Sequence, residues 1–204
     1  MTLTDLEAGA KARALWVSGV FHDGADTVAM LSPAADFWAR FIDDPEYNDG
    51  APDPMDRWSA RVIGAWAADL NACALFPFGP DAAPFLAMAK ASGRAHSSPV
   101  HLLVHDMAGL MISYRGALRM AGHLALPAPP PAPCPTCTRP CTTACPIGAL
   151  TTAGYDVPAC RAYLHSDAGA ECLKNGCLVR RACPAGLTHV RLKEQSEFHM
   201  RAFW

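Results

Sequence analysis

Eight of the nine cysteines lie between Cys134 and Cys183, in two groups that each end in Cys-Pro. The first group has the spacing Cys-x2-Cys-x3-Cys-x3-Cys-Pro and consists of Cys134, Cys137, Cys141 and Cys145. The second group has gaps of eleven, four and five residues and consists of Cys160, Cys172, Cys177 and Cys183. Two [4Fe–4S] clusters require about eight thiolates, four for each cluster. The cysteines therefore predict a protein that handles electrons through two [4Fe–4S] clusters.

The Cys-Pro pairs also predict which cysteines share a cluster. In the bacterial two-cluster pattern, the cysteine before the proline binds the other cluster. This rule predicts a first set of ligands, namely Cys134, Cys137, Cys141 and Cys183. It predicts a second set, namely Cys145, Cys160, Cys172 and Cys177. Gly148, shortly after Cys145, suits a position where the backbone turns sharply or passes close to a cluster.

Two other interpretations of the cysteines stay open. Zinc also takes four thiolates from Cys-x2-Cys spacings, although zinc ribbons usually pair two such knuckles and do not need Cys-Pro. The gap between Cys137 and Cys141 is one residue longer than in the usual two-cluster pattern, and the second group is irregular. A single cluster with spare cysteines is therefore the other alternative. The ninth cysteine, Cys73, lies beside Leu75 and Phe76 and is expected to be a small buried hydrophobe.

Composition narrows the functional classes. The 204 residues are 51% hydrophobic and 18% charged, with a net charge of −2. A charge this close to neutral argues against nucleic acid as the main partner, and no apolar run is long enough for a membrane span. The first residues lack the basic and apolar regions of a signal peptide, which predicts a cytoplasmic protein with reduced thiols. The odd number of cysteines also favours metal ligands over disulfides.

A proline-rich run divides the sequence. Residues 127–133 read Pro-Ala-Pro-Pro-Pro-Ala-Pro and predict an extended linker, because prolines disfavour helices and central strands. We expect four segments: an α/β domain over residues 1–126, the linker, a cluster module over 134–190, and a helical tail over 191–204. The role expected of the first domain is to bind a partner or a cofactor. Residues 1–133 carry nine Lys and Arg against fourteen Asp and Glu, a balance of −5. The acidic part is therefore the one expected to recognise a partner.

Patterns in the N-terminal part predict both helices and strands. Ser32-Pro33 and Asp53-Pro54 each place a capping side chain before a proline, which predicts two helix starts. Trp58, Val62, Trp66 and Leu70 recur every four residues and predict the buried face of a helix over residues 54–71. A further helix is expected over residues 81–93, and strands over 27–31, 74–76 and 102–104. The predicted fold class is α+β, a mixed α/β domain followed by a bacterial dicluster ferredoxin-like module.

Some polar and aromatic residues are weaker candidates. His101 and His105 would share a face of a strand, and two histidines without a third ligand are more often structural. Arg115 could bind an anionic cofactor group or form an ordinary ion pair. In the tail, Phe198, Phe203 and Trp204 are expected to cover a cluster or seal a domain interface.

From Cys134 to Pro184 the sequence resembles the dicluster ferredoxin module of epoxyqueuosine reductases and reductive dehalogenases. The resemblance rests on the first cysteine group with Cys145-Pro-Ile-Gly-Ala, on Cys160 followed by Tyr163-Leu164, and on Gly176-Cys177 and Cys183-Pro184. The whole chain resembles small bacterial proteins described only as ferredoxins. The resemblance implies that all eight cysteines bind two [4Fe–4S] clusters and that a redox partner protein exists.

The resemblance also implies an alternative function. The chain could be a reductase related to epoxyqueuosine reductase, with a corrinoid or flavin held by the N-terminal domain. No motif in the sequence identifies a catalytic residue for such a reaction. An electron-transfer protein that relays single electrons is therefore the preferred prediction.

Overall fold

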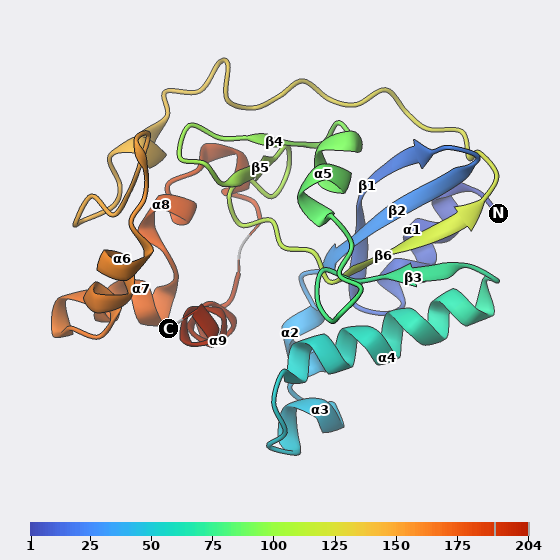
Figure 1. Ribbon diagram of the computed structural model, residues 1–204, viewed down its shortest axis with the longest axis horizontal. Helices are drawn as coiled ribbons and strands as arrows, with labels where there is room; N and C mark the ends of the chain where they lie inside the picture. Colours follow the sequence, from blue (N-terminus) through green and yellow to red (C-terminus); the bar gives the residue numbers. More distant parts are fainter. Residues whose placement is uncertain (190, 204) are drawn as a thin grey trace. The chain divides into compact units, whose positions relative to one another are not determined.

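Antiparallel strands and separate helices make up the computed structural model, which describes residues 1–189 and 191–203 (Figure 1). The fold is mixed α+β, as the sequence predicts. The chain divides into two compact units. Unit 1 contains Met1–Arg94 and Ser113–Pro130, and unit 2 contains Ala95–Ile112 and Pro131–Trp204. This division differs from a single boundary near residue 126, because Ala95–Ile112 belongs with the cysteine-rich part.

Unit 1 is built on a four-stranded antiparallel sheet with the order β1-β2-β6-β3. Its strands are β1 (Leu15–Asp23), β2 (Asp26–Pro33), β3 (Cys73–Leu75) and β6 (Gly116–Ala121). Its helices are α1 (Leu3–Lys11), α2 (Phe37–Phe41), α3 (Pro45–Asn48), α4 (Pro54–Asp69) and α5 (Phe85–Ala91). Trp58 and Trp66 of α4 are both buried, as their helical spacing predicts.

The predicted elements of unit 1 are partly right. Strands do form over Thr27–Leu31 and Ala74–Leu75, and α4 begins at Pro54 after Asp53. The helix start at Ser32-Pro33 is wrong, because these residues end β2 and the Ser32 hydroxyl donates to Ser18 Oγ at 2.8 Å instead of capping a helix. Helix α5 begins only after Pro84, since a proline disfavours helical backbone in the residue before it.

Unit 2 consists of short elements joined by turns. Its strand pairs are β4 (Ala95–Ser97) with β5 (Leu103–His105) and β7 (Leu150–Thr151) with β8 (Gly154–Tyr155). Its α-helices are α6 (Val157–Leu164), α7 (Ala170–Asn175), α8 (Leu178–Arg181) and α9 (Lys193–Phe203). Its 3-10 helices are η1 (Pro140–Thr142), η2 (Asp167–Gly169) and η3 (Pro184–Gly186). Helix α9 falls in the predicted helical tail, of which Trp204 lies outside the described residues.

Residues 123–132, which include most of the proline-rich segment, belong to no helix or strand, and Figure 1 draws them as a plain trace. The start of the segment packs on unit 1, because a Cβ added to Gly93 would lie 2.7 Å from Pro129 Cβ. Part of the linker is therefore fixed to unit 1.

Packing between α1 and α4 gives a test of the unit 1 core. A Cβ added to Gly9 would lie 2.6 Å from the buried ring of Trp66, whereas one added to Gly64 of α4 would meet nothing within 4 Å. We expect Gly9→Ala to lower the free energy of unfolding by about 1–3 kcal/mol through overpacking. Gly64→Ala is the control and should raise it by about 0.5–1 kcal/mol, because alanine favours helix. Urea unfolding of both variants checks that the two changes in the free energy of unfolding have opposite signs. Two changes of the same sign would contradict this packing.

Candidate metal centre

The eight clustered cysteines come from turns and short helices of unit 2. Cys134 and Cys137 lie in a turn in which the Cys137 N–H donates to the Cys134 carbonyl at 3.3 Å. Cys141 lies in η1, and Cys145 follows it in irregular backbone. Cys160 lies in α6 and Cys172 in α7. Cys177 and Cys183 directly precede α8 and η3. No long element is needed to position any of these thiols.

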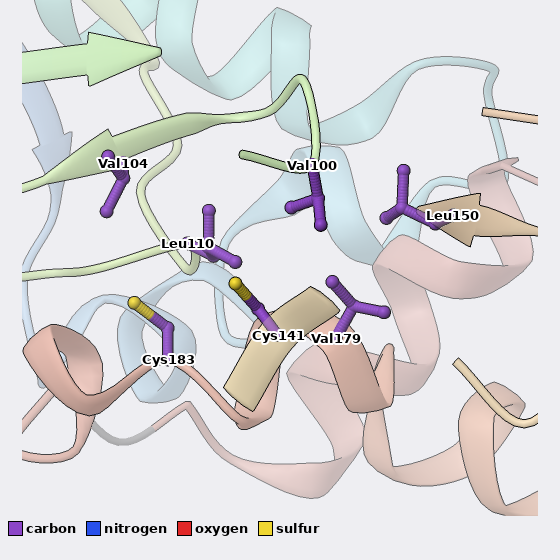
Figure 2. Close-up of a cluster of buried hydrophobic side chains, with 7 residues drawn as sticks. All are labelled: Val100, Val104, Leu110, Cys141, Leu150, Val179 and Cys183. Carbon is purple, nitrogen blue, oxygen red and sulfur yellow. The ribbon is translucent and has the colours of Figure 1, made fainter. Parts of the chain in front are cut away.

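The first set lies beside the apolar core of unit 2. Cys141 and Cys183 are buried in this core, and Cys134 packs against it. The other core residues are Val100, Val104, Leu110, Leu150 and Val179. Figure 2 shows the sulfurs of Cys141 and Cys183 on the sides of their backbones that face Leu110. Two of the proposed ligands are therefore shielded from water by aliphatic side chains.

Charge effects on the pKa link the four thiols of the first set, three of which also share the apolar core of unit 2. Burial raises the pKa of the Cys134 thiol, and the nearby thiols of Cys183 and Cys137 raise it further. The pKa of Cys141 is also raised, mainly by burial and further by the thiols of Cys183, Cys134 and Cys137. Such effects require short distances between the groups. The structure thus brings Cys183 next to the first three cysteines of the sequence.

The second set surrounds a cavity. All four of its members line the cavity, together with aliphatic and aromatic side chains that include Tyr155, Tyr163 and Met200. Burial raises the pKa of Cys160, and the thiols of Cys177 and Cys145 raise it further. Burial is also the main cause that raises the pKa of Cys172, with contributions from the other three thiols of the set. Cys145 thus lies with the later cysteines, although its motif belongs to the first group.

The two sets border the same aliphatic side chains. Leu150 and Val179 belong to the apolar core beside the first set and also line the cavity of the second set. Cys145 and Cys177 pack against the same core. The two sets therefore lie on one shared apolar core.

A backbone N–H group donates to one of the sulfurs, since the Arg139 N–H lies 3.2 Å from Cys137 Sγ. The backbone of Leu178 lowers the pKa of Cys172 against the larger effect of burial. Arg139 has the left-handed φ of 57°. It lies in the gap that is one residue longer than usual, so the extra residue is accommodated by this turn. N–H donors stabilise negative charge on sulfur.

Within residues 1–189 and 191–203, no three Cys, His, Asp or Glu side chains converge closely enough to hold a single metal ion. A [4Fe–4S] cluster is bound differently, since its four thiolates bind separate irons and surround a space. Soft thiolates in an apolar shell suit such a cluster.

The cavity of the second set is small. Its volume of about 30 Å³ has room for about two water molecules. A cluster at this site therefore requires the side chains that line the cavity to move apart. The identity of the donors fits the group, and the side chains have to adjust to its size.

The hairpin β4–β5 and the turn after it form one wall of the first set, which the sequence interpretation missed. A Cβ added to Gly109 would lie 2.9 Å from Cys183 Sγ and 2.5 Å from the Gly186 nitrogen. The Arg180 guanidinium donates to the Leu110 carbonyl at 2.8 Å. Only the apolar run at Leu102–Val104 predicts this hairpin, and nothing in its sequence predicts contact with cysteines about 80 residues later.

The two histidine candidates do not share a strand face. His101 lies outside β5, and its Nε2 is 3.0 Å from the Thr152 carbonyl. His105 is fully buried, and its Nδ1 accepts from the N–H groups of Met107 and Ala108. His105 therefore fixes the turn that places Gly109 beside Cys183, which is a structural role.

The remaining candidates have mixed outcomes. Cys73 is exposed, so its prediction as a buried hydrophobe is wrong, because it lies on the short edge strand β3. Arg115 forms an ion pair with Asp56 at 3.3 Å, the more ordinary of its two expected roles, and burial lowers its pKa.

The Phe203 ring stacks on Tyr155, which lines the cavity of the second set. Met200 of α9 lines this cavity, and the expectation that the tail aromatics cover a cluster or seal an interface stays a prediction.

Unit 1 contains a separate cavity of about 150 Å³ between α1, β1 and the start of the proline-rich segment. Sites for drug-sized ligands usually have about 300–1,000 Å³. The cavity is therefore too small to enclose a flavin or a corrinoid.

Among the described residues, no helix has the length and apolar character needed to cross a membrane. Comparisons with protein-family models, with curated proteins and with solved structures gave no match.

Proposed function

We propose that this chain is an electron-transfer protein that binds two [4Fe–4S] clusters, one held by each set of four cysteines. The observation that carries the proposal is the grouping of the thiols. Cys145 lies with the second set and Cys183 with the first, which is the exchange of ligands that two-cluster ferredoxins use. Four thiols in each group match the donor number of a cubane cluster.

The chain's own residues would perform the tasks that electron transfer requires. A [4Fe–4S] cluster, when bound, accepts and returns one electron. The buried side chains of Leu150 and Val179 would cover both clusters on an apolar side. The N–H group of Arg139 would stabilise charge on Cys137.

A redox partner protein and a reducing compartment such as the cytoplasm belong to this proposal. All nine cysteines lie within the described residues, and none of them forms a disulfide. Disulfide-free cysteine clusters suit the reducing cytoplasm, where thiolates stay free to bind metal. The acidic unit 1 is our candidate for the surface that recognises the partner.

Iron and sulfide counting tests the proposal. We expect anaerobic reconstitution to give about eight irons and about eight sulfides per chain, with a broad visible absorption that decreases on reduction. Cys73→Ser is the control, because Cys73 is exposed and belongs to neither set. About four irons would leave one cluster, and stoichiometric zinc without iron would contradict the proposal.

A further inference from the structure

A tyrosine hydroxyl contacts one sulfur of the second set. Tyr155 Oη donates to Cys160 Sγ at a distance of 3.5 Å. A phenol is protonated at neutral pH and can therefore act as a donor to a thiolate. Tyr155 is the last residue of β8, five residues before Cys160, and nothing in the sequence predicts the contact.

The C-terminal helix holds the ring of Tyr155 in place. Phe203 at the end of α9 stacks on Tyr155 with a centroid distance of 6.1 Å and an interplanar angle of 9°. Phe203 is itself fixed by Arg161, whose guanidinium lies 5.3 Å from the Phe203 ring centroid. The Nε of Arg161 also donates to the Phe203 carbonyl at 3.0 Å. Arg161 follows Cys160 directly in α6, so the helix end, the tyrosine and the cysteine form one connected group.

We infer that Tyr155 is a positioning residue that raises the reduction potential of the cluster held by the second set. This inference rests on the proposed function. Reduction adds one electron and hence negative charge to the cluster and its thiolates. A hydrogen bond donated to a ligand sulfur stabilises this added charge, so the reduced form is favoured. The stack of Phe203 on Tyr155 holds the ring that carries this hydroxyl beside Cys160.

The two clusters would then differ in potential for an identifiable reason. In the second set a phenol hydroxyl donates to Cys160, whereas in the first set the backbone N–H of Arg139 donates to Cys137. A difference in potential gives an electron a preferred resting site. The hydrogen bond from Tyr155 therefore increases the preference of the electron for the cluster of the second set.

Tyr163 supplies a matched control. It lines the same cavity, but its hydroxyl donates to the Ala168 carbonyl at 2.7 Å. Tyr155→Phe and Tyr163→Phe therefore remove the same atom beside the same site, and only the first change removes a donor to a ligand sulfur. Both variants keep the aromatic ring.

The test is a redox titration with dithionite, followed by electron paramagnetic resonance, on the reconstituted full-length chain. Cys145→Ser identifies which signal belongs to the second set. We expect Tyr155→Phe to move the potential of this signal to a more negative value, while the other signal and both signals of Tyr163→Phe stay at their wild-type potentials. Unchanged potentials in a fully loaded Tyr155→Phe protein would overturn the inference.

Two further measurements separate the failure modes. A wild-type chain that binds no iron overturns the proposed function itself, before any potential is compared. If Tyr155→Phe does not retain about four irons at the second set, Phe203→Leu decides, because it keeps Tyr155 and removes the stack that holds its hydroxyl toward Cys160. A negative shift in Phe203→Leu supports the inference, and an unchanged potential overturns it.

Discussion

Cys145→Ser is expected to halve the iron content, from about eight irons per chain to about four, and to remove the cluster of the second set. The serine hydroxyl is a harder and less acidic ligand than a thiol, so it is a poor replacement on iron. In the sequence, Cys145 is the last cysteine of the regular first motif. In the structure, its thiol lines the cavity with Cys160, Cys172 and Cys177.

The reciprocal variant sharpens this test. Cys183→Ser should remove the other cluster, because Cys183 is coupled to Cys134 and Cys141 although it ends the second group. Paramagnetic resonance should therefore show complementary losses in the two variants. Both variants should keep the far-ultraviolet circular dichroism of unit 1, which contains neither set. If Cys145→Ser instead disturbed only the first-set signal, the exchange of ligands between the groups would be wrong.

The second large effect is expected for Gly109→Ala. Gly109 has a φ of 53°, and an added Cβ would lie 2.5 Å from the Gly186 nitrogen and 2.9 Å from Cys183 Sγ. Backbone strain and overpacking together should lower the free energy of unfolding by about 2–4 kcal/mol. The backbone of Gly186 cannot move away without displacing Cys183. We therefore expect loss of the first-set signal together with the loss of stability.

Gly24→Ala is the matched control for this prediction. Gly24 has a similar φ of 61°, but a Cβ there would meet nothing within 4 Å. This variant should therefore show only the cost of the left-handed backbone, about 1–2 kcal/mol, and keep its full iron content. Urea unfolding and iron counting distinguish the two variants. Equal behaviour would mean that the turn at Gly109 does not control the position of Cys183.

The grouping of the cysteines could be predicted from the sequence because it depends on local spacing and on the proline after Cys145. Helix α4 could be predicted because Trp58 and Trp66 repeat at helical intervals. The packing of the β4–β5 hairpin beside Cys183 could not, because contacts between distant segments leave no local pattern. Tyr155 was missed for a related reason, since the role of its hydroxyl depends on the tertiary position of Cys160 and Phe203.

The wrong predictions have local causes. Ser32-Pro33 has the sequence of a helix start, but strand pairing and the contact with Ser18 decide its conformation. Cys73 was expected to be buried because of its apolar neighbours. It lies instead at the start of a short edge strand, where alternate side chains face solvent. In both cases tertiary pairing overrides a local preference.

The path of the chain between the units has a consequence for synthesis. The chain leaves unit 1 after Arg94, returns to it at Ser113, and leaves it again after Pro130. Residues 95–112 thus emerge from the ribosome before the cysteines that Val100, Val104 and Leu110 later pack against. Until residue 183 has been made, these aliphatic side chains lack part of the core that buries them. The hairpin can therefore complete its packing only after most of unit 2 has been synthesised.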